Sequence, residues 1–272
     1  MGIRRKVTLV LLASFLLWSG AIEPRLVKVD RVVVEVPGLP EAFEGFTFLH
    51  LSDLHSTTFG PGQERLLGLL LKEDFDAVAF TGDMVDSSTG DSRPLVELLA
   101  GLPRQKPKYF VPGNHELSLA QEDPESWVRL EREMGSFGAE VLADRIVGIY
   151  RDGASLFIGG AVAKPGEPVD LKRLSGSTVL LCHVPFVMDQ GAELGIAVVL
   201  TGHTHGGQVR IPGLGALFVP GDTFPPKYSE GLYKLKGTSM YVNPGLGTTR
   251  IGLRFNCPPR VSLVTLRAAG RD

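Results

Sequence analysis

Hydrophobic and polar positions alternate early in the chain and then gather into short apolar runs separated by turn residues. Residues 26–36 (LVKVDRVVVEV) alternate well enough to predict a first strand, which ends at a Pro and Gly turn. Apolar runs at 46–52, 76–82 and 108–113 predict further strands. Apolar residues at helical spacing predict intervening helices over 63–73, 93–101 and 124–134. The first half therefore predicts alternating strands and helices.

After about residue 139 the pattern changes to strands at short spacing. We expect them at 154–160, 178–182, 196–201, 231–236, 240–243 and 261–266. Two β-rich halves accompanied by helices indicate an α/β fold in which two packed sheets carry outer helices. The 272 residues suit one large domain, because no repeat or low-complexity linker divides them.

The start of the chain has a different pattern. Three basic residues at 4–6 precede an uncharged run at 7–22, and the small residues at 19–21 resemble a signal-peptidase site. The run is slightly shorter than the roughly 17 to 25 residues of a spanning helix, so residues 1–22 are either a signal segment or a membrane anchor. Basic residues before the run favour an extracytoplasmic domain, although the basic residues at 25, 28 and 31 weaken that inference.

Five strand-like runs end in short loops that carry carboxylate, amide and imidazole side chains. These loops hold five of the six histidines in the chain. Oxygen and nitrogen donors of this kind suit divalent first-row metals better than soft thiolate chemistry does. The candidates are Asp53, His55, Asp83, Asp86, Asn114, His115, His183, His203 and His205.

The position of these loops predicts that their side chains converge. Open α/β sheets bind ligands beyond the carboxyl ends of their strands, where residues distant in sequence meet. In an extended segment residues i and i+2 point the same way, so Asp53 and His55 can face one site, as can His203 and His205. About eight donors exceed the needs of one ion, which indicates two ions about 3.5 to 4 Å apart that share a carboxylate. Asp83 is our candidate for the bridge.

The ordered motifs DxH, GDxxD, GNH(D/E), a later single His, and GHxH resemble the calcineurin-like metallophosphoesterase superfamily. They stand at residues 53–55, 82–86, 113–116, 183 and 202–205, and the resemblance covers about residues 30–267. The segments at 202–212 and 243–249 resemble bacterial membrane-tethered phosphodiesterases, a group that includes enzymes acting on UDP-2,3-diacylglucosamine in lipid A biosynthesis. The resemblance implies a four-layer αββα sandwich of two mixed sheets flanked by helices, spanning residues 26–270.

The resemblance also implies roles for individual residues. It implies two divalent ions, from among Mn²⁺, Fe²⁺ or Fe³⁺ and Zn²⁺, and His115 beside the substrate phosphate with Asp86 orienting it. The first ion would take Asp53, His55, Asp83 and His205, and the second would take Asp83, Asn114, His183 and His203.

The expected chemistry is phosphodiester or pyrophosphate hydrolysis of a membrane-linked substrate by a metal-bridging hydroxide, with His115 protonating the leaving group. Two alternatives stay open. One is a phosphomonoesterase on the same site, and the other is a catalytically idle metal-binding interaction protein. The net charge of −2 and the lack of a basic cluster with interleaved aromatics disfavour nucleic acid as a partner.

Several other residues receive simpler interpretations. Alternation places His50 away from Asp53, so we exclude it as a ligand, and nothing supports a disulfide between Cys182 and Cys257. The loop at 206–231 is rich in apolar residues that can contact a lipid, but we favour their packing the loop onto the body. They are Leu214, Leu217, Phe218, Val219, Phe224 and Tyr228.

Overall fold

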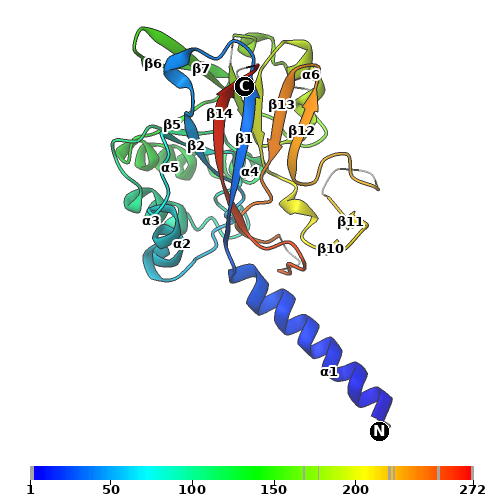
Figure 1. Cartoon of the computed structure of the whole chain (residues 1–272). Helices are drawn as coiled ribbons and strands as arrows, with labels where there is room; N and C mark the ends of the chain where they lie inside the picture. Colours follow the sequence, from blue (N-terminus) through cyan, green and yellow to red (C-terminus); the bar gives the residue numbers. More distant parts are fainter. Residues whose placement is uncertain are drawn as a thin grey trace.

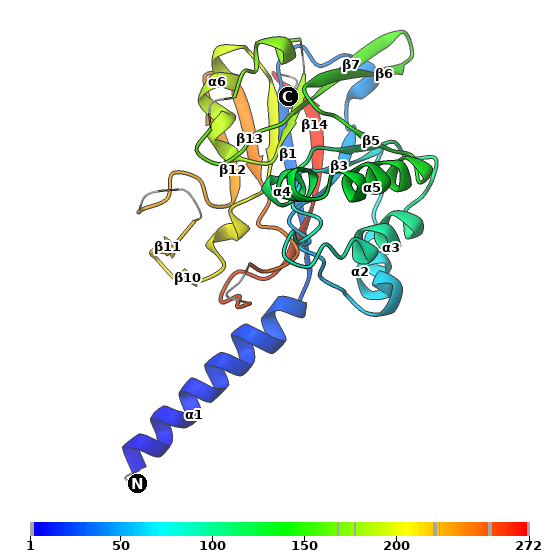
Figure 2. The same ribbon diagram turned by 180° about the vertical axis from the view of Figure 1, so that it is seen from behind.

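Two six-stranded mixed sheets pack face to face, with helices on their outer faces, in a computed structural model of the chain (Figures 1 and 2). The structure describes residues 3–167, 169–176, 178–219, 222, 224–249 and 252–270. This is the αββα sandwich that the sequence predicts. A long N-terminal helix, α1 (Ile3–Leu17), projects from one end of the sandwich.

The first sheet has the strand order β1-β14-β2-β3-β4-β5, so both ends of the domain meet in it. β1 pairs in parallel with β14, which in turn pairs antiparallel with β2. The strands are β1 (Lys28–Val36), β2 (Thr47–Leu51), β3 (Ala77–Phe80), β4 (Lys108–Phe110), β5 (Ala139–Val141) and β14 (Arg260–Ala268).

The second sheet has the order β12-β13-β9-β8-β7-β6. β7, β8, β9 and β13 run parallel to one another, while the edge strands β6 and β12 are antiparallel. The strands are β6 (Arg145–Arg151), β7 (Ala154–Ala161), β8 (Val179–Cys182), β9 (Val198–Thr201), β12 (Gly231–Leu235) and β13 (Thr238–Val242); a separate hairpin joins β10 (Arg210–Ile211) to β11 (Gly215–Ala216).

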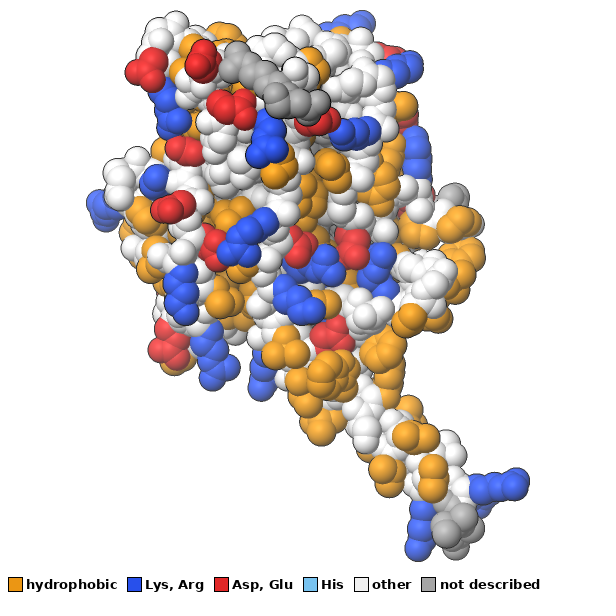
Figure 3. All heavy atoms as spheres, viewed as in Figure 1, with side chains coloured by type: hydrophobic (Ala, Val, Ile, Leu, Met, Phe, Trp, Pro, Cys, Tyr) orange, Lys and Arg blue, Asp and Glu red, His pale blue; other side chains and the backbone are white. Residues whose placement is uncertain are grey.

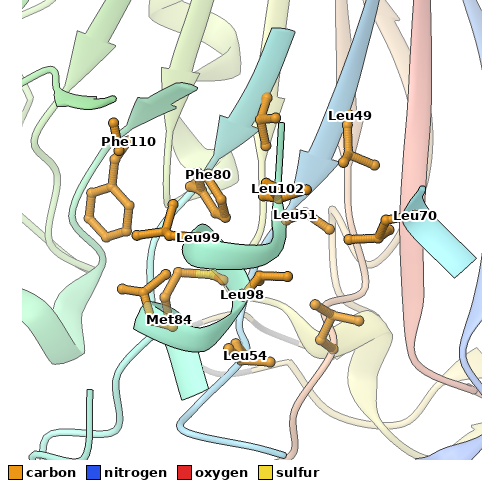
Figure 4. Packing of buried hydrophobic residues seen from close by; sticks show 14 of the residues in the cluster. Leu49, Leu51, Leu54, Leu70, Phe80, Met84, Leu98, Leu99, Leu102 and Phe110 are labelled. Carbon is orange, nitrogen blue, oxygen red and sulfur yellow. The ribbon is translucent and has the colours of Figure 1, made fainter. Parts of the chain in front are cut away.

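The core has three layers because side chains alternate across each central strand. In β2, Phe48 faces the second sheet, whereas Leu49 and Leu51 face the outer helices. Figure 4 shows the outer layer, where Leu49 and Phe80 from the sheet meet leucines of α2 and α3. The helices are α2 (Glu64–Leu70), α3 (Arg93–Gly101), α4 (Asn114–Glu122) and α5 (Pro124–Ser136) on the first sheet and α6 (Met188–Glu193) on the second.

Most expected elements are present, with boundaries shifted by a few residues. The sequence did not predict α4, α6, β5, β6 or the β10–β11 hairpin. His50 is fully buried and hydrogen-bonds Thr81 Oγ1 at 2.8 Å, as expected for a residue inside the sandwich. Cys182 and Cys257 are both buried and free.

The loop at 206–231 differs from our interpretation. Val219 and Tyr228 are buried, but four of its six large apolar side chains are exposed by between 39% and 64%. Packing onto the body therefore explains only part of this loop. The exposed residues are Leu214, Leu217, Phe218 and Phe224.

The N-terminal helix is long and apolar enough to cross a membrane: helical structure runs from Arg4 to Arg25 with a mean hydropathy of 1.6. Its apolar side chains are exposed over most of its length, whereas its last turns pack on the domain. Ser19 and Glu23 are buried there. Figure 3 shows hydrophobic side chains along the helix and on the part of the body beside its exit.

Candidate metal centre

Five strands from both sheets deliver the candidate residues to one end of the sandwich. β2, β3 and β4 of the first sheet lead into the loops of Asp53, Asp83 and Asn114, and β8 and β9 of the second lead into those of His183 and His203. The loops follow the carboxyl ends of these strands, the position at which α/β sheets bind ligands. Asn114 is also the first residue of α4.

One group of donors forms around Asp53, His55 and His205, which can hold a metal ion. The Nε2 atoms of the two histidines lie 3.1 Å apart. Asp53 Oδ1 lies 3.5 Å from His205 Nε2 and 4.0 Å from His55 Nε2. All three side chains are buried, so the polar atoms face one another rather than solvent.

A second group of donors surrounds His183. Its Nε2 lies 3.1 Å from Asp83 Oδ2, 3.1 Å from Asn114 Oδ1 and 3.2 Å from His203 Nδ1. The same Asp83 oxygen lies 3.7 Å from His55 Nε2 of the first group. Asp83 therefore stands between the two groups, at the position expected of a bridging carboxylate.

The electrostatics of the two groups suit bound cations. Burial raises the pKa of Asp53 to about 7. Burial alone would also raise the pKa of Asp83, but the charge of His183 and its hydrogen bond lower it. Burial alone would lower the pKa of His183, but the charge of Asp83 and its hydrogen bond raise it to about 10. A proton on His183 thus compensates buried negative charge. A divalent cation would supply that compensation more completely.

The orientation of His183 also fits a metal ligand. Its Nδ1–H donates to the backbone carbonyl of Thr81 at 2.8 Å, which leaves Nε2 directed at the other donors. Metal-binding histidines are commonly oriented by such a hydrogen bond from the second ring nitrogen. Together with the imidazole, carboxylate and amide donors, this arrangement fits two divalent first-row cations.

Backbone conformation at the site is strained. Asp53, His55, Asp83, His203 and His205 all have positive φ, between 46° and 70°. Residues other than glycine seldom adopt this region, and each instance costs of order 1 to 3 kcal/mol. Such strain persists only where surrounding structure enforces it. The loops are therefore built to aim their side chains rather than to minimise local energy.

Two glycines allow the loops to approach one another. A Cβ at Gly82, where φ is +85°, would overlap the backbone of Gly113. A Cβ at Gly202 would overlap the side chains of Ser52 and Asp53. Only glycine fits these two positions, because the metal loops touch there.

Glu116 is a functional residue to which sequence reasoning assigned no role, although it belongs to the GNH(D/E) motif. Its Oε2 accepts from the backbone N–H groups of Asp83 at 2.7 Å and Gly113 at 2.8 Å. Its Oε1 accepts from Val85 N–H at 2.9 Å. Burial, followed by the charge of Asp83, raises the pKa of Glu116 to about 7. This buried carboxylate therefore holds the loop that follows β3 against the loop that follows β4.

His115 lies at the rim of the site with 28% of its side chain exposed. Its backbone N–H donates to Asp83 Oδ1 at 2.8 Å. Its ring Nδ1 accepts from the N–H of Ser87 at 3.0 Å, while Asp86 Oδ1 approaches that nitrogen only to 3.8 Å. The hydrogen bond that fixes the ring thus comes from Ser87, which sequence reasoning did not identify, and it leaves Nε2 to carry the proton of the neutral ring.

The last turns of the N-terminal helix reach the underside of this site. The N–H of Cys257 donates to Glu23 Oε1 at 2.6 Å, and its thiol donates to the carbonyl of His205 at 3.4 Å. The buried guanidinium of Arg254 binds the carbonyls of Pro244, Gly245 and Gly247. Gly247 N–H in turn donates to the carbonyl of Asp53 at 2.6 Å.

A comparison with family models finds a match described as calcineurin-like phosphoesterase over residues 46–207. That range contains every candidate metal ligand.

Three relatives span most of this chain. The uncharacterized metallophosphoesterase YkuE of Bacillus subtilis is 27% identical over 92% of this chain and 89% of its own length. The phosphodiesterase YaeI of Escherichia coli is 28% identical over 81% of this chain and 82% of its own. A transmembrane protein with metallophosphoesterase domain from Danio rerio is 29% identical over 95% of this chain, which spans 61% of that protein.

Among solved structures, the phosphopantetheinyl hydrolase PptH of Mycobacterium tuberculosis is similar over 78% of this chain and 96% of that one. The two share 12% identity with a TM-score of 0.43, so we draw no functional conclusion from this likeness.

Proposed function

This chain belongs to the calcineurin-like phosphoesterase family of metal-dependent phosphohydrolases, and from that premise we propose that it is a dinuclear, membrane-associated phosphodiesterase or pyrophosphatase. The observation that carries the proposal is the pair of donor groups joined at Asp83. The first ion would be held by Asp53, His55, Asp83 and His205, and the second by Asp83, Asn114, His183 and His203. Two cations, when bound, supply Lewis-acid stabilisation of phosphoryl charge and acidify coordinated water to a pKa of roughly 7.

The chain's own residues would then position the substrate and hydrogen-bond its leaving oxygen. Because Ser87 N–H occupies His115 Nδ1, the neutral imidazole presents an Nε2–H to the rim of the site. That N–H can donate to the leaving oxygen of a phosphate ester as negative charge develops on it. Asp86 Oδ1, 3.8 Å from His115 Nδ1, lies beyond hydrogen-bond distance and would act on the ring only through space.

Diester chemistry and a membrane-linked substrate are the finer parts of the proposal. The name of the Escherichia coli relative, a phosphodiesterase, supports the first. The apolar helix from Arg4 to Arg25 and the transmembrane relative from Danio rerio support the second. A lipid-linked nucleotide sugar such as UDP-2,3-diacylglucosamine is the most specific candidate, and the domain would lie outside the cytoplasm.

The test is hydrolysis of bis-p-nitrophenyl phosphate and p-nitrophenyl phosphate by the full chain in detergent, stripped of metal and reloaded with Mn²⁺. An Asp83→Ala variant serves as the control for the metal centre. We expect metal-dependent cleavage that favours the diester and is lost in the variant, and UDP-2,3-diacylglucosamine is then the next substrate.

Two other results of this assay would support the alternative functions. A preference for the monoester would make the protein a phosphomonoesterase. Silence on both esters and on UDP-2,3-diacylglucosamine, despite two bound Mn²⁺ per chain, would refute the enzymatic proposal in favour of an idle metal-binding protein. Full activity of a His115→Ala variant on esters with poor leaving groups would refute only the role of His115 as hydrogen-bond donor to the leaving oxygen.

A further inference from the structure

Four large hydrophobic side chains are exposed on and beside the β10–β11 hairpin: Ile211 (42%), Leu214 (57%), Leu217 (39%) and Phe218 (61%). We call these four residues the apolar hairpin surface. Single exposed apolar residues are common, but several within eight consecutive positions mark a contact surface. The hairpin itself is ordered by pairing of Arg210 with Ala216 and by a turn in which Leu214 N–H donates to the Ile211 carbonyl at 3.0 Å.

Phe255 connects this hairpin to the end of α1. Arg210 N–H donates to the carbonyl of Phe255 at 2.9 Å, and the Phe255 ring lies 4.9 Å from that of Phe15 in α1. Trp18 at the end of the helix and Pro212 in the hairpin turn line one cavity of about 320 Å³. Figures 1 and 2 agree that α1 leaves the body on the side that carries β10 and β11.

The helix is also fixed to the domain rather than joined by a flexible linker. Arg254 N–H donates to the carbonyl of buried Ser19 at 2.8 Å, and the carboxylate of buried Glu23 accepts from Cys257 N–H. A bilayer crossed by α1 would therefore meet the domain in a defined orientation. The exposed basic residues Arg25 and Lys28 stand at and just beyond the end of this helical segment and suit anionic headgroups.

We propose that the apolar hairpin surface inserts into the interfacial layer of the bilayer that α1 crosses and so holds the metal centre beside the lipid headgroups. The inference rests on the membrane association in the proposed function. The hairpin follows His205 closely in sequence, and Gly207, in the same loop, packs against Ala216 of β11. Docking the hairpin thus also sets the height of the His205 loop above the lipid.

A bilayer is the expected occupant because the apolar hairpin surface and the apolar helix α1 lie on the same side of the body. The four side chains lie on the side of the body from which α1 leaves, and that helix is itself apolar and exposed from Val7 to Leu17, so one apolar environment can cover both. Insertion of large aliphatic and aromatic side chains at this depth is the way interfacial segments bind membranes. A second copy of the chain or a soluble protein on this surface would give different results in the experiment below.

The test uses the full chain reconstituted in vesicles of phosphatidylcholine and phosphatidylglycerol, with an environment-sensitive fluorophore on one introduced cysteine. Positions are Phe218→Cys in the hairpin, Val10→Cys in α1, and Tyr150→Cys, which is 74% exposed on β6 at the opposite end of the body. Cys182 and Cys257 are buried and are not expected to react. We expect spin-labelled lipid to quench at least about half of the emission at positions 10 and 218 but not at 150.

The pattern of quenching distinguishes failure of hairpin docking from failure of the membrane anchor in the proposed function. Quenching at position 10 without quenching at 218 would overturn the docking of the hairpin and leave the anchor intact, as would protection of 218 by self-association or a soluble protein. Absence of quenching at position 10 would remove the anchor and with it the docking.

A kinetic arm measures the consequence for activity. A Leu214→Ser, Phe218→Ser double variant of the full chain should keep its rate on soluble bis-p-nitrophenyl phosphate within about twofold and lose about tenfold on a phosphodiester embedded in vesicles. A matched Val128→Ser, Tyr150→Ser variant, with both changes in exposed side chains, should lose neither activity. Equal effects of the hairpin variant on the two esters, whether absent or large, would overturn the inference.

Discussion

Replacement of Glu116 tests whether a single buried carboxylate holds the metal loops together. Its two oxygens accept three backbone N–H groups, from Asp83, Val85 and Gly113, at 2.7 to 2.9 Å. A buried donor left without an acceptor costs about 1 to 3 kcal/mol, so a Glu116→Ala variant, which orphans three, should lose about 3 to 9 kcal/mol. Water entering the new space makes the lower half of that range the expectation.

A graded series sharpens this prediction. Glu116→Gln can keep two of the three hydrogen bonds if its amide oxygen takes the place of Oε2, so it should lose only about 1 to 3 kcal/mol. Glu122→Gln lies on the same helix with its side chain exposed and should change stability by less than about 0.5 kcal/mol. The order of stability is therefore Glu122→Gln, then Glu116→Gln, then Glu116→Ala.

The assay is thermal unfolding of the full chain in detergent, with and without Mn²⁺, together with Mn²⁺ affinity by titration calorimetry. For a domain of this size 1 kcal/mol corresponds to roughly 2 to 4 °C, so the alanine variant should melt about 10 °C lower. Its Mn²⁺ affinity should also fall, because the Asp83 loop loses an anchor. An alanine variant that melts within about 2 °C of the parent and binds Mn²⁺ equally would refute the role of Glu116 in holding these loops together.

Three further predictions concern acid stability, packing and the helix base. Burial lowers the pKa of His50 to about 3, so below about pH 6.5 the unfolded chain binds a proton that the folded chain does not. The free energy of unfolding should therefore fall by up to about 1.4 kcal/mol per pH unit between about pH 6.5 and about pH 3. A His50→Gln variant should show a weaker dependence on pH in this range, measured by urea unfolding. Gly202→Ala should lower kcat/KM at least about 10²-fold by displacing a metal-binding carboxylate, whereas Gly68→Ala, with open space at its Cβ, should leave kcat/KM unchanged. Removal of residues 1–17 should leave the melting temperature in detergent nearly unchanged. Removal of residues 1–22 should lower it by several degrees, because the hydrogen bond from Arg254 N–H to the Ser19 carbonyl is lost. Equal melting temperatures of the two shortened proteins would show that residues 18–22 do not stabilise the domain.

Local sequence predicts the strands and their loops well because the information is local. Alternation in β2 and the short apolar runs of β3 and β8 each follow from the residues within them. The loops that follow carry donors in recognisable order, and the fold brings these donors together. α4 escaped prediction because Pro-Gly-Asn before it indicates a turn, and the helix begins directly at Asn114.

Contacts between distant segments could not be predicted in the same way. Glu116 lies within the GNH(D/E) motif, but its partners on the Asp83 loop are backbone N–H groups, and residue types do not reveal such contacts. Ser87, whose N–H and hydroxyl both lie within hydrogen-bond distance of His115 Nδ1, belongs to no motif that the sequence displays. The exposure of Leu214 and Phe218 likewise depends on which surfaces the rest of the chain leaves uncovered.

The contacts between the helix base and the candidate metal centre bear on what a membrane anchor would do for catalysis. Glu23 binds the amide of Cys257, whose thiol donates to the carbonyl of His205, so the helix base and a candidate ligand belong to one packed unit. If α1 crosses a bilayer as proposed, this attachment would fix the height of the metal centre above that bilayer. A substrate held in the same bilayer then needs no free diffusion to reach the site, whereas a soluble ester gains nothing from the anchor. Loss of membrane docking should therefore raise KM for a membrane-embedded ester and leave kcat nearly unchanged, because the groups that act in the transition state are untouched.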